Sequence, residues 1–184
     1  MSTYNRANAT FGGYAAALGI VVLIVLAMAL VVAGRTREHI PSVDYTADLI
    51  ALRDVAPYTT YAPEEVPEGW VPTSTLLDTG GALPGEEPTA PVSWTLGFAT
   101  PADRHAELAI SDAPHERFVA TATENGEPDG TAEVAGSTWD RYVNAAGDHR
   151  ALVLRDGDAT VVVSGSSDYA ELAELAASLR PDGG

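Results

Sequence analysis

Hydrophobic and polar positions divide the chain into a long apolar run followed by a region of short alternating patterns. Residues Phe11–Gly34 form a run of 24 residues without a charged side chain. At about 1.5 Å of rise per residue, this run forms a helix of about 36 Å, longer than the roughly 30 Å hydrocarbon core of a bilayer. We therefore expect one N-terminal transmembrane helix over residues 11–34, preceded by a short tail over residues 1–10.

The rest of the chain is expected to contain one domain. A juxtamembrane linker covers residues 35–42, the domain covers residues 43–180, and a tail covers residues 181–184. A segment of about 150 residues is a common size for one domain and buries enough surface for a single hydrophobic core.

Three segments of the domain predict helices. In the first and the last of them, apolar side chains recur at three and four residues, which places them on one face of a helix. Ser42 or Asp44 is expected to cap the first helix, and Asp168 the last. The three predicted helices cover residues 44–56, 114–123 and 168–179.

Between the helices, apolar and polar residues alternate with the period of β-strands. Strands are expected over residues 70–77, 92–100, 104–111, 138–144, 149–155 and 159–165, with a further strand beginning near Thr131. Short turns join consecutive strands, so the pairing is antiparallel. Pro72 lacks a backbone donor, so its strand lies at an edge or contains a bulge. We predict an α+β fold, an antiparallel sheet of about six to seven strands with helices packed on it.

Charge and the lack of cysteine exclude several functions. The chain has 26 acidic residues, ten arginines and no lysine, which gives a net charge of −16. Because nucleic-acid binding needs cationic side chains, we expect no nucleic-acid partner. The chain contains no cysteine, so thiolate metal sites, thiol nucleophiles and disulfides are excluded.

The orientation of the apolar run is ambiguous in the sequence. Arg6 precedes the run, whereas Arg35, Arg37 and Arg53 follow it, and the positive-inside rule would then keep the domain in the cytoplasm. Long domains, however, are often translocated regardless of flanking charge. The run is also longer than the apolar core of a signal peptide, which favours an uncleaved anchor, although small residues at 32–34 leave cleavage open.

No catalytic or metal-binding pattern stands out. The histidines lie one per predicted element, without the spacing of a helical metal site. No serine has the Gly-x-Ser-x-Gly context of a nucleophile elbow, and residues 164–167 are interpreted as a strand end before a capped helix. The turn at residues 156–158 lacks the further ligands of a calcium loop. The four histidines are His39, His105, His115 and His149.

Paired acids and tryptophans were the remaining candidates for a site. Residues 64–65 and 86–87 are glutamate pairs in proline-rich loops, where the carboxylates stay solvated. Trp70, Trp94 and Trp139 begin or lie in predicted strands, so packing in the core is favoured over contact with a ligand. We expect no catalytic, cofactor-binding or metal-binding residue, and the sequence does not identify a ligand-binding residue.

Five segments together resemble a known family. They are Val43-Asp44-Tyr45, Pro67-Glu68-Gly69-Trp70, Trp94-Thr95-Leu96-Gly97-Phe98-Ala99-Thr100-Pro101, Gly136-Ser137-Thr138-Trp139 and Leu172-Ala173-Glu174-Leu175-Ala176-Ala177-Ser178-Leu179. The chain resembles the actinobacterial single-pass membrane proteins grouped as domain of unknown function 4245. The resemblance covers nearly the whole chain and implies an envelope location with the domain outside. It implies no activity and no binding residues.

These observations favour a membrane-anchored extracytoplasmic domain that binds a protein or another envelope component without catalysis. Its expected partners are the lipid bilayer, through Phe11–Gly34, and an envelope protein, and no cofactor is expected. An alternative is an enzyme that acts on an envelope polymer through carboxylates brought together by folding. A third reading is a structural or chaperone-like accessory to a neighbouring membrane protein.

Overall fold

The computed structural model describes residues 11–35, 41–83 and 85–182, and the chain divides into two units, Met1–His39 and Ile40–Gly184. In the first unit, α1 (Phe11–Arg35) is one continuous helix of 25 residues, and the side chains at 16–29 are exposed. Across the described residues, no helix meets the length and apolarity that crossing a membrane requires. The expected transmembrane role of residues 11–34 therefore stays a prediction.

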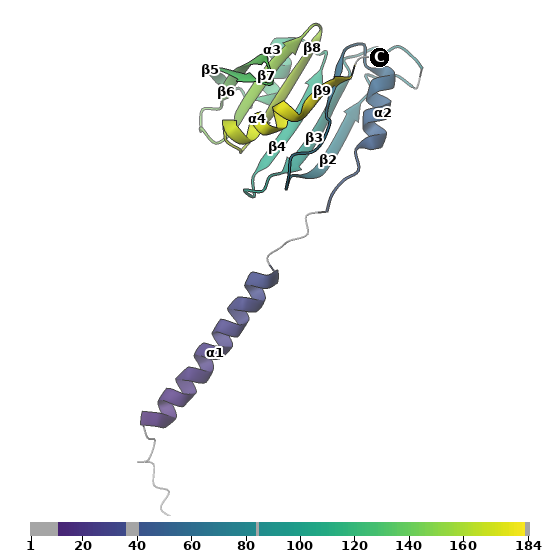
Figure 1. Cartoon of the computed structure of the whole chain (residues 1–184). Helices are drawn as coiled ribbons and strands as arrows, with labels where there is room; N and C mark the ends of the chain where they lie inside the picture. Colours follow the sequence, from purple (N-terminus) through teal and green to yellow (C-terminus); the bar gives the residue numbers. More distant parts are fainter. Residues whose placement is uncertain (1–10, 36–40, 84, 183–184) are drawn as a thin grey trace, which may run out of the picture. The chain divides into compact units, whose positions relative to one another are not determined.

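The second unit is built on a seven-stranded sheet in which every pairing is antiparallel (Figure 1). Along the sheet, the strands follow the order β2-β3-β4-β8-β7-β6-β5, and a separate two-stranded sheet pairs β1 with β9. The strands are β1 (Thr60–Pro63), β2 (Val71–Asp78), β3 (Ser93–Ala99), β4 (His105–Ser111), β5 (Glu127–Val134), β6 (Ser137–Val143), β7 (Arg150–Asp156), β8 (Ala159–Gly165) and β9 (Leu179–Asp182). The predicted α+β class and the antiparallel sheet are confirmed.

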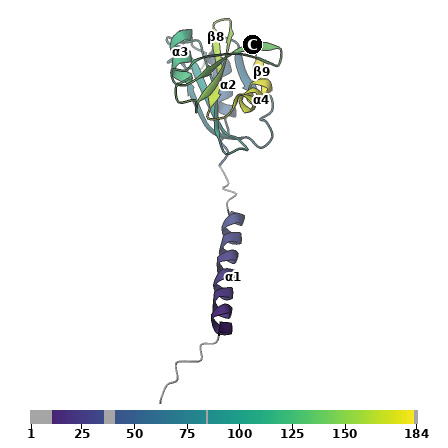
Figure 2. The same cartoon turned by 90° about the vertical axis from the view of Figure 1, so that its left-hand side faces the viewer.

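Helices lie on both faces of this sheet. Figure 2 shows α3 on one side of the strands and α4 on the other. Asp168 caps α4 as predicted, because its Oδ1 accepts hydrogen bonds from the amides of Ala170 and Glu171 at 3.0 and 3.1 Å. The helices of this unit are α2 (Thr46–Val55), α3 (His115–Ala122) and α4 (Tyr169–Ser178).

The predicted cap of α2 is wrong in its position. Tyr45 occupies the N-cap and makes no side-chain capping bond. Asp44 lies one residue earlier, and its Oδ1 accepts from the Thr46 amide at 2.9 Å. Asp44 therefore stabilises the first turn from outside the cap, and Ser42 is not the cap.

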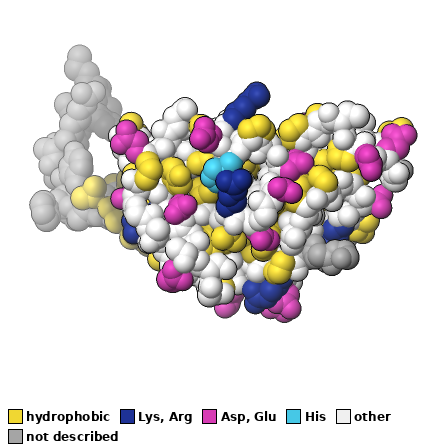
Figure 3. Space-filling model, turned by 90° about the horizontal axis from the view of Figure 1, so that it is seen from above, with side chains coloured by type: hydrophobic (Ala, Val, Ile, Leu, Met, Phe, Trp, Pro, Cys, Tyr) yellow, Lys and Arg dark blue, Asp and Glu magenta, His cyan; other side chains and the backbone are white. Residues whose placement is uncertain are grey.

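Charge on the surface is mostly acidic. Acidic side chains are spread over the face seen in Figure 3, between apolar ones, and basic side chains are fewer.

Both edge strands of the seven-stranded sheet, β2 and β5, carry features that oppose pairing with another sheet. In β2 the register shifts between Pro72 and Ser74, and in β5 between Pro128 and Thr131. The prediction that Pro72 marks an edge strand or a bulge is confirmed on both counts.

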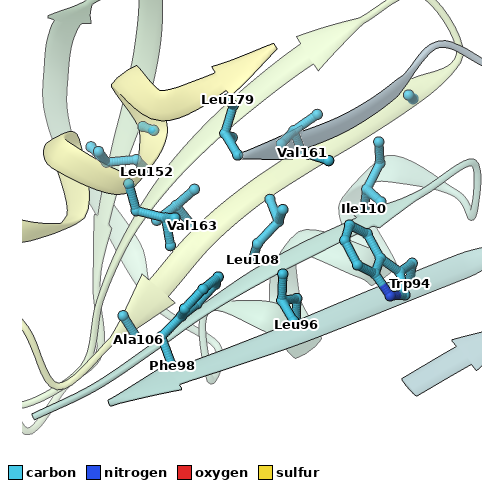
Figure 4. Close-up of a cluster of buried hydrophobic side chains, with 14 of the residues drawn as sticks. Trp94, Leu96, Phe98, Ala106, Leu108, Ile110, Leu152, Val161, Val163 and Leu179 are labelled. Carbon is cyan, nitrogen blue, oxygen red and sulfur yellow. The ribbon is translucent and has the colours of Figure 1, made fainter. Parts of the chain in front are cut away.

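One face of the sheet, here called the closed face, carries the main core. Figure 4 shows its side chains, which come from β3, β4, β7, β8 and β9. Leu52 of α2 and Trp70 belong to the same cluster. The labelled members are Trp94, Leu96, Phe98, Ala106, Leu108, Ile110, Leu152, Val161, Val163 and Leu179.

The opposite face, here called the open face, has a smaller apolar cluster under α3. Its buried members are Ala109, Val119, Ala151, Val153 and Val162. Beyond α3, strand alternation places polar and small residues of β3 and β4 on this face. On the edge strand β2, Leu76 pairs with Thr95 and is 71% exposed. The open face is therefore only partly covered.

Two strands were not predicted. The sequence predicts an extended, proline-punctuated segment before Trp70 and a tail over residues 181–184. In the structure, β1 pairs with β9, and Tyr61 lies opposite Pro181. Such a strand pair shows no alternating pattern, because prolines interrupt it and it is only four residues long. The strand expected near Thr131 begins earlier, at Glu127.

Candidate functional site

Ionisable side chains that are far apart in the sequence meet in one pocket on the open face. The pocket has a volume of about 320 Å³ and lies between β3, β4, β8 and the helix α3 with the loop that follows it. We call it the His–Glu pocket, after His105, Glu107, Glu124 and His149. The other lining residues are Thr95, Ala109, Phe118, Thr121, Ala122 and Ser164.

Glu107 lies at the sheet floor of this pocket. In the sheet register it sits between Gly97 of β3 and Ser164 of β8. Burial raises the pKa of the Glu107 carboxyl, and the nearby His105 and His149 act in the opposite direction. The Glu107 side chain is half-buried, and among the described residues its carboxylate is not one of the buried polar groups that lack a hydrogen-bond partner, so it stays open to the pocket. A half-buried acid with a raised pKa in a pocket is a candidate for a functional group.

His149 and Glu124 form one rim of the pocket and are fixed by Asn144. The Asn144 amide nitrogen donates to Glu124 Oε2 at 3.1 Å, and the His149 backbone amide donates to Asn144 Oδ1 at 3.1 Å. His149 Nδ1 lies 3.6 Å from Glu124 Oε1, and its Nε2 lies 3.3 Å from the carbonyl oxygen of Ala122. Both ring nitrogens thus face oxygen atoms, so the ring orientation is fixed from two sides.

His105 is positioned by the residues that end β8. Ser166 Oγ accepts from the His105 amide at 3.1 Å and lies 3.4 Å from the His105 carbonyl oxygen. A methyl group at Gly165 would collide with that carbonyl oxygen, so glycine permits the close approach of β8 to β4. The serine-rich segment at residues 164–167, interpreted from the sequence as a strand end and cap, therefore also holds one wall of the pocket.

The three tryptophans do not line the His–Glu pocket. Trp70, Trp94 and Trp139 are buried, and the prediction that they pack in the core is confirmed. Trp94 also donates from Nε1 to Thr75 Oγ1 at 3.0 Å, which satisfies its polar atom inside the core.

The remaining sequence candidates lie outside the pocket. His115 Nδ1 is 2.9 Å from Thr160 Oγ1. Asp156 lies at the β7–β8 turn and accepts a hydrogen bond from the Tyr61 hydroxyl at 2.8 Å. Burial, together with this hydrogen bond, raises the pKa of Tyr61 to about 12. Glu64 pairs with Arg180 at 3.0 Å. His39 lies outside the described residues.

Metal binding finds no support in the described part of the chain. Within residues 11–35, 41–83 and 85–182, no three or more histidine, aspartate or glutamate side chains form a group that could hold a metal ion. The glutamate pairs at 64–65 and 86–87 are exposed.

A sequence signal for the pocket existed but was incomplete. His105 and Glu107 are two residues apart in a strand whose alternate positions are apolar, so both must lie on the face opposite to Leu108. His149 and Glu124 belong to loops, and only the strand order brings them next to β4. In the sequence the histidines are scattered, and no motif marks either glutamate as a site residue.

Comparison with known families decides the classification. A family model described as "Protein of unknown function (DUF4245)" matches residues 6–179. The chain belongs to the DUF4245 family. This confirms the family predicted from the sequence, while the actinobacterial origin and the single-pass anchoring stay predictions. A comparison of this DUF4245 protein with curated proteins finds no match.

Among solved structures, the crystal structure of MucB in complex with MucA(peri) is similar to this DUF4245 chain at a TM-score of 0.38. The sequence identity is 17%, and the match covers 67% of this chain. The DUF4245 chain matches only 37% of the length of the MucB chain.

Proposed function

We propose that this protein is a single-pass membrane protein whose acidic domain lies outside the cytoplasm and binds an envelope component without catalysis. The anchor is supported by the 24-residue run without charge, which falls within one continuous helix, α1. The domain is supported as a unit of its own by the division of the chain into two compact units.

The observation that carries the binding role is the His–Glu pocket. Removing a carboxylate partly from water is unfavourable, and burial raises the pKa of Glu107. Glu107 is half-buried in a pocket on a face of the sheet that α3 leaves partly open. A perturbed carboxylate in a pocket supports a binding role for this position.

One observation favours the alternative function, an enzyme acting on an envelope polymer. Glu107 and Glu124 line the same pocket, and the pKa of Glu107 is raised by burial, as in a general acid. If this alternative holds, purified protein releases reducing ends from envelope polysaccharide, and Glu107→Gln abolishes the release. We expect no release of reducing ends from the natural protein or from the Glu107→Gln variant.

The location can be tested with single cysteines, because the natural chain has none. Ala102→Cys places a thiol in the exposed turn between β3 and β4, and Ser2→Cys places one before the apolar run. A membrane-impermeant maleimide is expected to label Ala102→Cys in intact cells and Ser2→Cys only after permeabilisation. The reverse pattern would place the domain in the cytoplasm and overturn the proposal.

Membrane attachment is tested separately. After extraction of broken cells with alkaline carbonate, the full-length protein is expected to remain in the membrane pellet. Two acidic residues in the middle of the run, Val22→Asp with Ile24→Asp, are expected to weaken insertion, because charge in the bilayer core is costly. Release of the unaltered full-length protein into the soluble fraction would contradict the anchor.

A further inference from the structure

The walls of the His–Glu pocket define the chemistry of what fits inside it. Glu107 and Glu124 contribute two carboxylates, whereas none of the described residues that line the pocket is an arginine, and the chain has no lysine. The remaining walls include the ring of Phe118 and the methyl groups of Ala109 and Ala122. The pocket therefore combines acceptors of positive charge with an apolar surface that suits an alkyl stem.

We infer that the His–Glu pocket binds a primary ammonium or a guanidinium group carried on a short aliphatic stem. The inference deepens the proposed binding function and depends on it. The cationic head donates hydrogen bonds to the Glu107 carboxylate at the sheet floor of the pocket, and charge-assisted hydrogen bonds of this kind are the stronger ones in proteins. The stem lies against Phe118, whose ring face also attracts cations.

The volume of the pocket agrees with a ligand of this size. About 320 Å³ is at the lower end of the range for small-molecule sites. It accommodates one side chain the length of lysine or arginine and is small for a folded segment. The same head group occurs on basic side chains of proteins and on free alkyl amines, so the experiment must separate these two sources.

Binding is expected to weaken in acid. The ionisable groups lining the pocket are His105 and Glu107 from β4, Glu124 from the loop after α3, and His149 before β7, while β3 and β8 contribute only Thr95 and Ser164. Burial raises the pKa of Glu107, so its carboxylate takes up a proton at a higher pH than an exposed glutamate does. The protonated group no longer attracts a cationic ligand.

The test uses the full-length protein in detergent micelles at physiological salt, titrated by calorimetry. The probes are Ac-Gly-Lys-Gly-NH₂, Ac-Gly-Arg-Gly-NH₂ and n-butylammonium, and Ac-Gly-norleucine-Gly-NH₂ is the matched uncharged probe. We expect the charged probes to bind and the norleucine peptide not to bind. Tighter binding of a charged peptide than of n-butylammonium identifies a protein side chain as the source, and the opposite order identifies a free amine.

Variants separate the pocket from the general acidity of the chain. Glu107→Gln is expected to weaken binding of the charged probes by roughly tenfold or more, the size of one charge-assisted hydrogen bond. Glu124→Gln, at the exposed rim, is expected to weaken it a few-fold. Glu87→Gln, an identical change in an exposed loop, should leave it unchanged.

Three results would overturn the inference. They are no binding of any charged probe at millimolar concentration, equal binding of the norleucine peptide, and equal loss in the Glu87→Gln and Glu107→Gln proteins. A far-ultraviolet circular dichroism spectrum of each variant verifies that it is folded. None of these results bears on cysteine labelling in cells, so the inference can fail while the proposed location stands.

The acid dependence provides a second readout. We expect the charged probes to bind several-fold more weakly at pH 5.5 than at pH 7.5. Glu107→Gln removes the half-buried carboxyl and should reduce this dependence, whereas Glu87→Gln, in an exposed loop, should preserve it. Unchanged dependence in the Glu107→Gln protein would contradict the assigned role of Glu107.

Discussion

The two faces of the central sheet are built for different tasks. On the closed face, α2, α4 and the β1–β9 pair cover a continuous apolar core, and Trp94, Leu96 and Phe98 are fully buried. On the open face, α3 covers only a small cluster, and next to it lies a pocket with two glutamates and two histidines. The same strands supply both faces, because alternate residues point to opposite sides.

This difference teaches where stability and binding reside. Burial of apolar surface is the main favourable contribution to folding, and most of it occurs on the closed face. The open face can then hold a partly desolvated carboxylate that reduces stability. Functional groups commonly carry such a cost. Substitutions on the closed face should therefore lower stability more than binding. Substitutions in the pocket of the open face should lower binding more than stability.

The largest effect is expected from truncation in the core of the closed face. Trp94 is fully buried, contacts Tyr45 with ring centroids 6.0 Å apart and donates a hydrogen bond to Thr75. Trp94→Ala is expected to lower the free energy of unfolding by about 3–5 kcal/mol, as measured by urea denaturation.

The matched control for this substitution is Leu76→Ala on the open face. Leu76 belongs to the strand adjacent to that of Trp94 but is 71% exposed, so its truncation should change the free energy of unfolding by about 0.5 kcal/mol or less. Similar losses for the two variants would show that the faces do not differ in this way.

Much of this arrangement could be predicted from the sequence. The alternation in residues 92–100 and 104–111 placed β3 and β4 to within about a residue, because each has one apolar side and a clear turn between them. The β1–β9 pair was missed because it is short, contains prolines and is formed by segments more than 100 residues apart. Local patterns carry no information about such a pairing.

A smaller effect, which links the faces, is expected at the end of β8. A methyl group at Gly165 would collide with the His105 carbonyl oxygen and approach Ala106 Cα at 2.8 Å. Gly165→Ala should therefore separate β8 from β4 and lower the free energy of unfolding by about 1–3 kcal/mol. It should also displace His105, which NMR chemical shifts of the imidazole would report.

Ser166→Ala is the milder comparison for Gly165→Ala. It removes the hydroxyl that bonds the His105 backbone but creates no collision, so a loss of about 1 kcal/mol is expected. If Gly165→Ala left both stability and the imidazole shifts of His105 unchanged, the close approach of β8 would not be what positions the histidine.

The candidate site was less predictable than the fold for a physical reason. The face on which His105 and Glu107 lie follows from strand alternation alone, but their neighbours Glu124 and His149 are placed by the β4-β8-β7 strand order. That order inserts β8, which is later in the chain than β7, between two strands that are distant in sequence. A sequence shows which side chains can share a face, but the pairing of strands decides which of them meet.

The smallest effect, and the most diagnostic one, is expected from Glu107→Gln. Burial raises the folded-state pKa of Glu107 above its ordinary value of 4.5. Its contribution to stability is therefore fully present below about pH 4.5 and is lost as the pH rises through the raised folded-state pKa. Because glutamine carries no charge at any pH, Glu107→Gln should be slightly more stable than the natural protein at pH 7. The difference should disappear as the pH falls below that ordinary value.

Urea midpoints measured between pH 3.5 and pH 8 provide the measurement, with Glu87→Gln as a control that should show no such pH dependence. A core residue of the closed face could not give this result, since every truncation there removes favourable burial. If Glu107→Gln were instead less stable at all pH values, the carboxylate would be a structural partner within the fold. Glu107 would then stabilise the fold, and the proposed difference between a stabilising closed face and a binding open face would be contradicted.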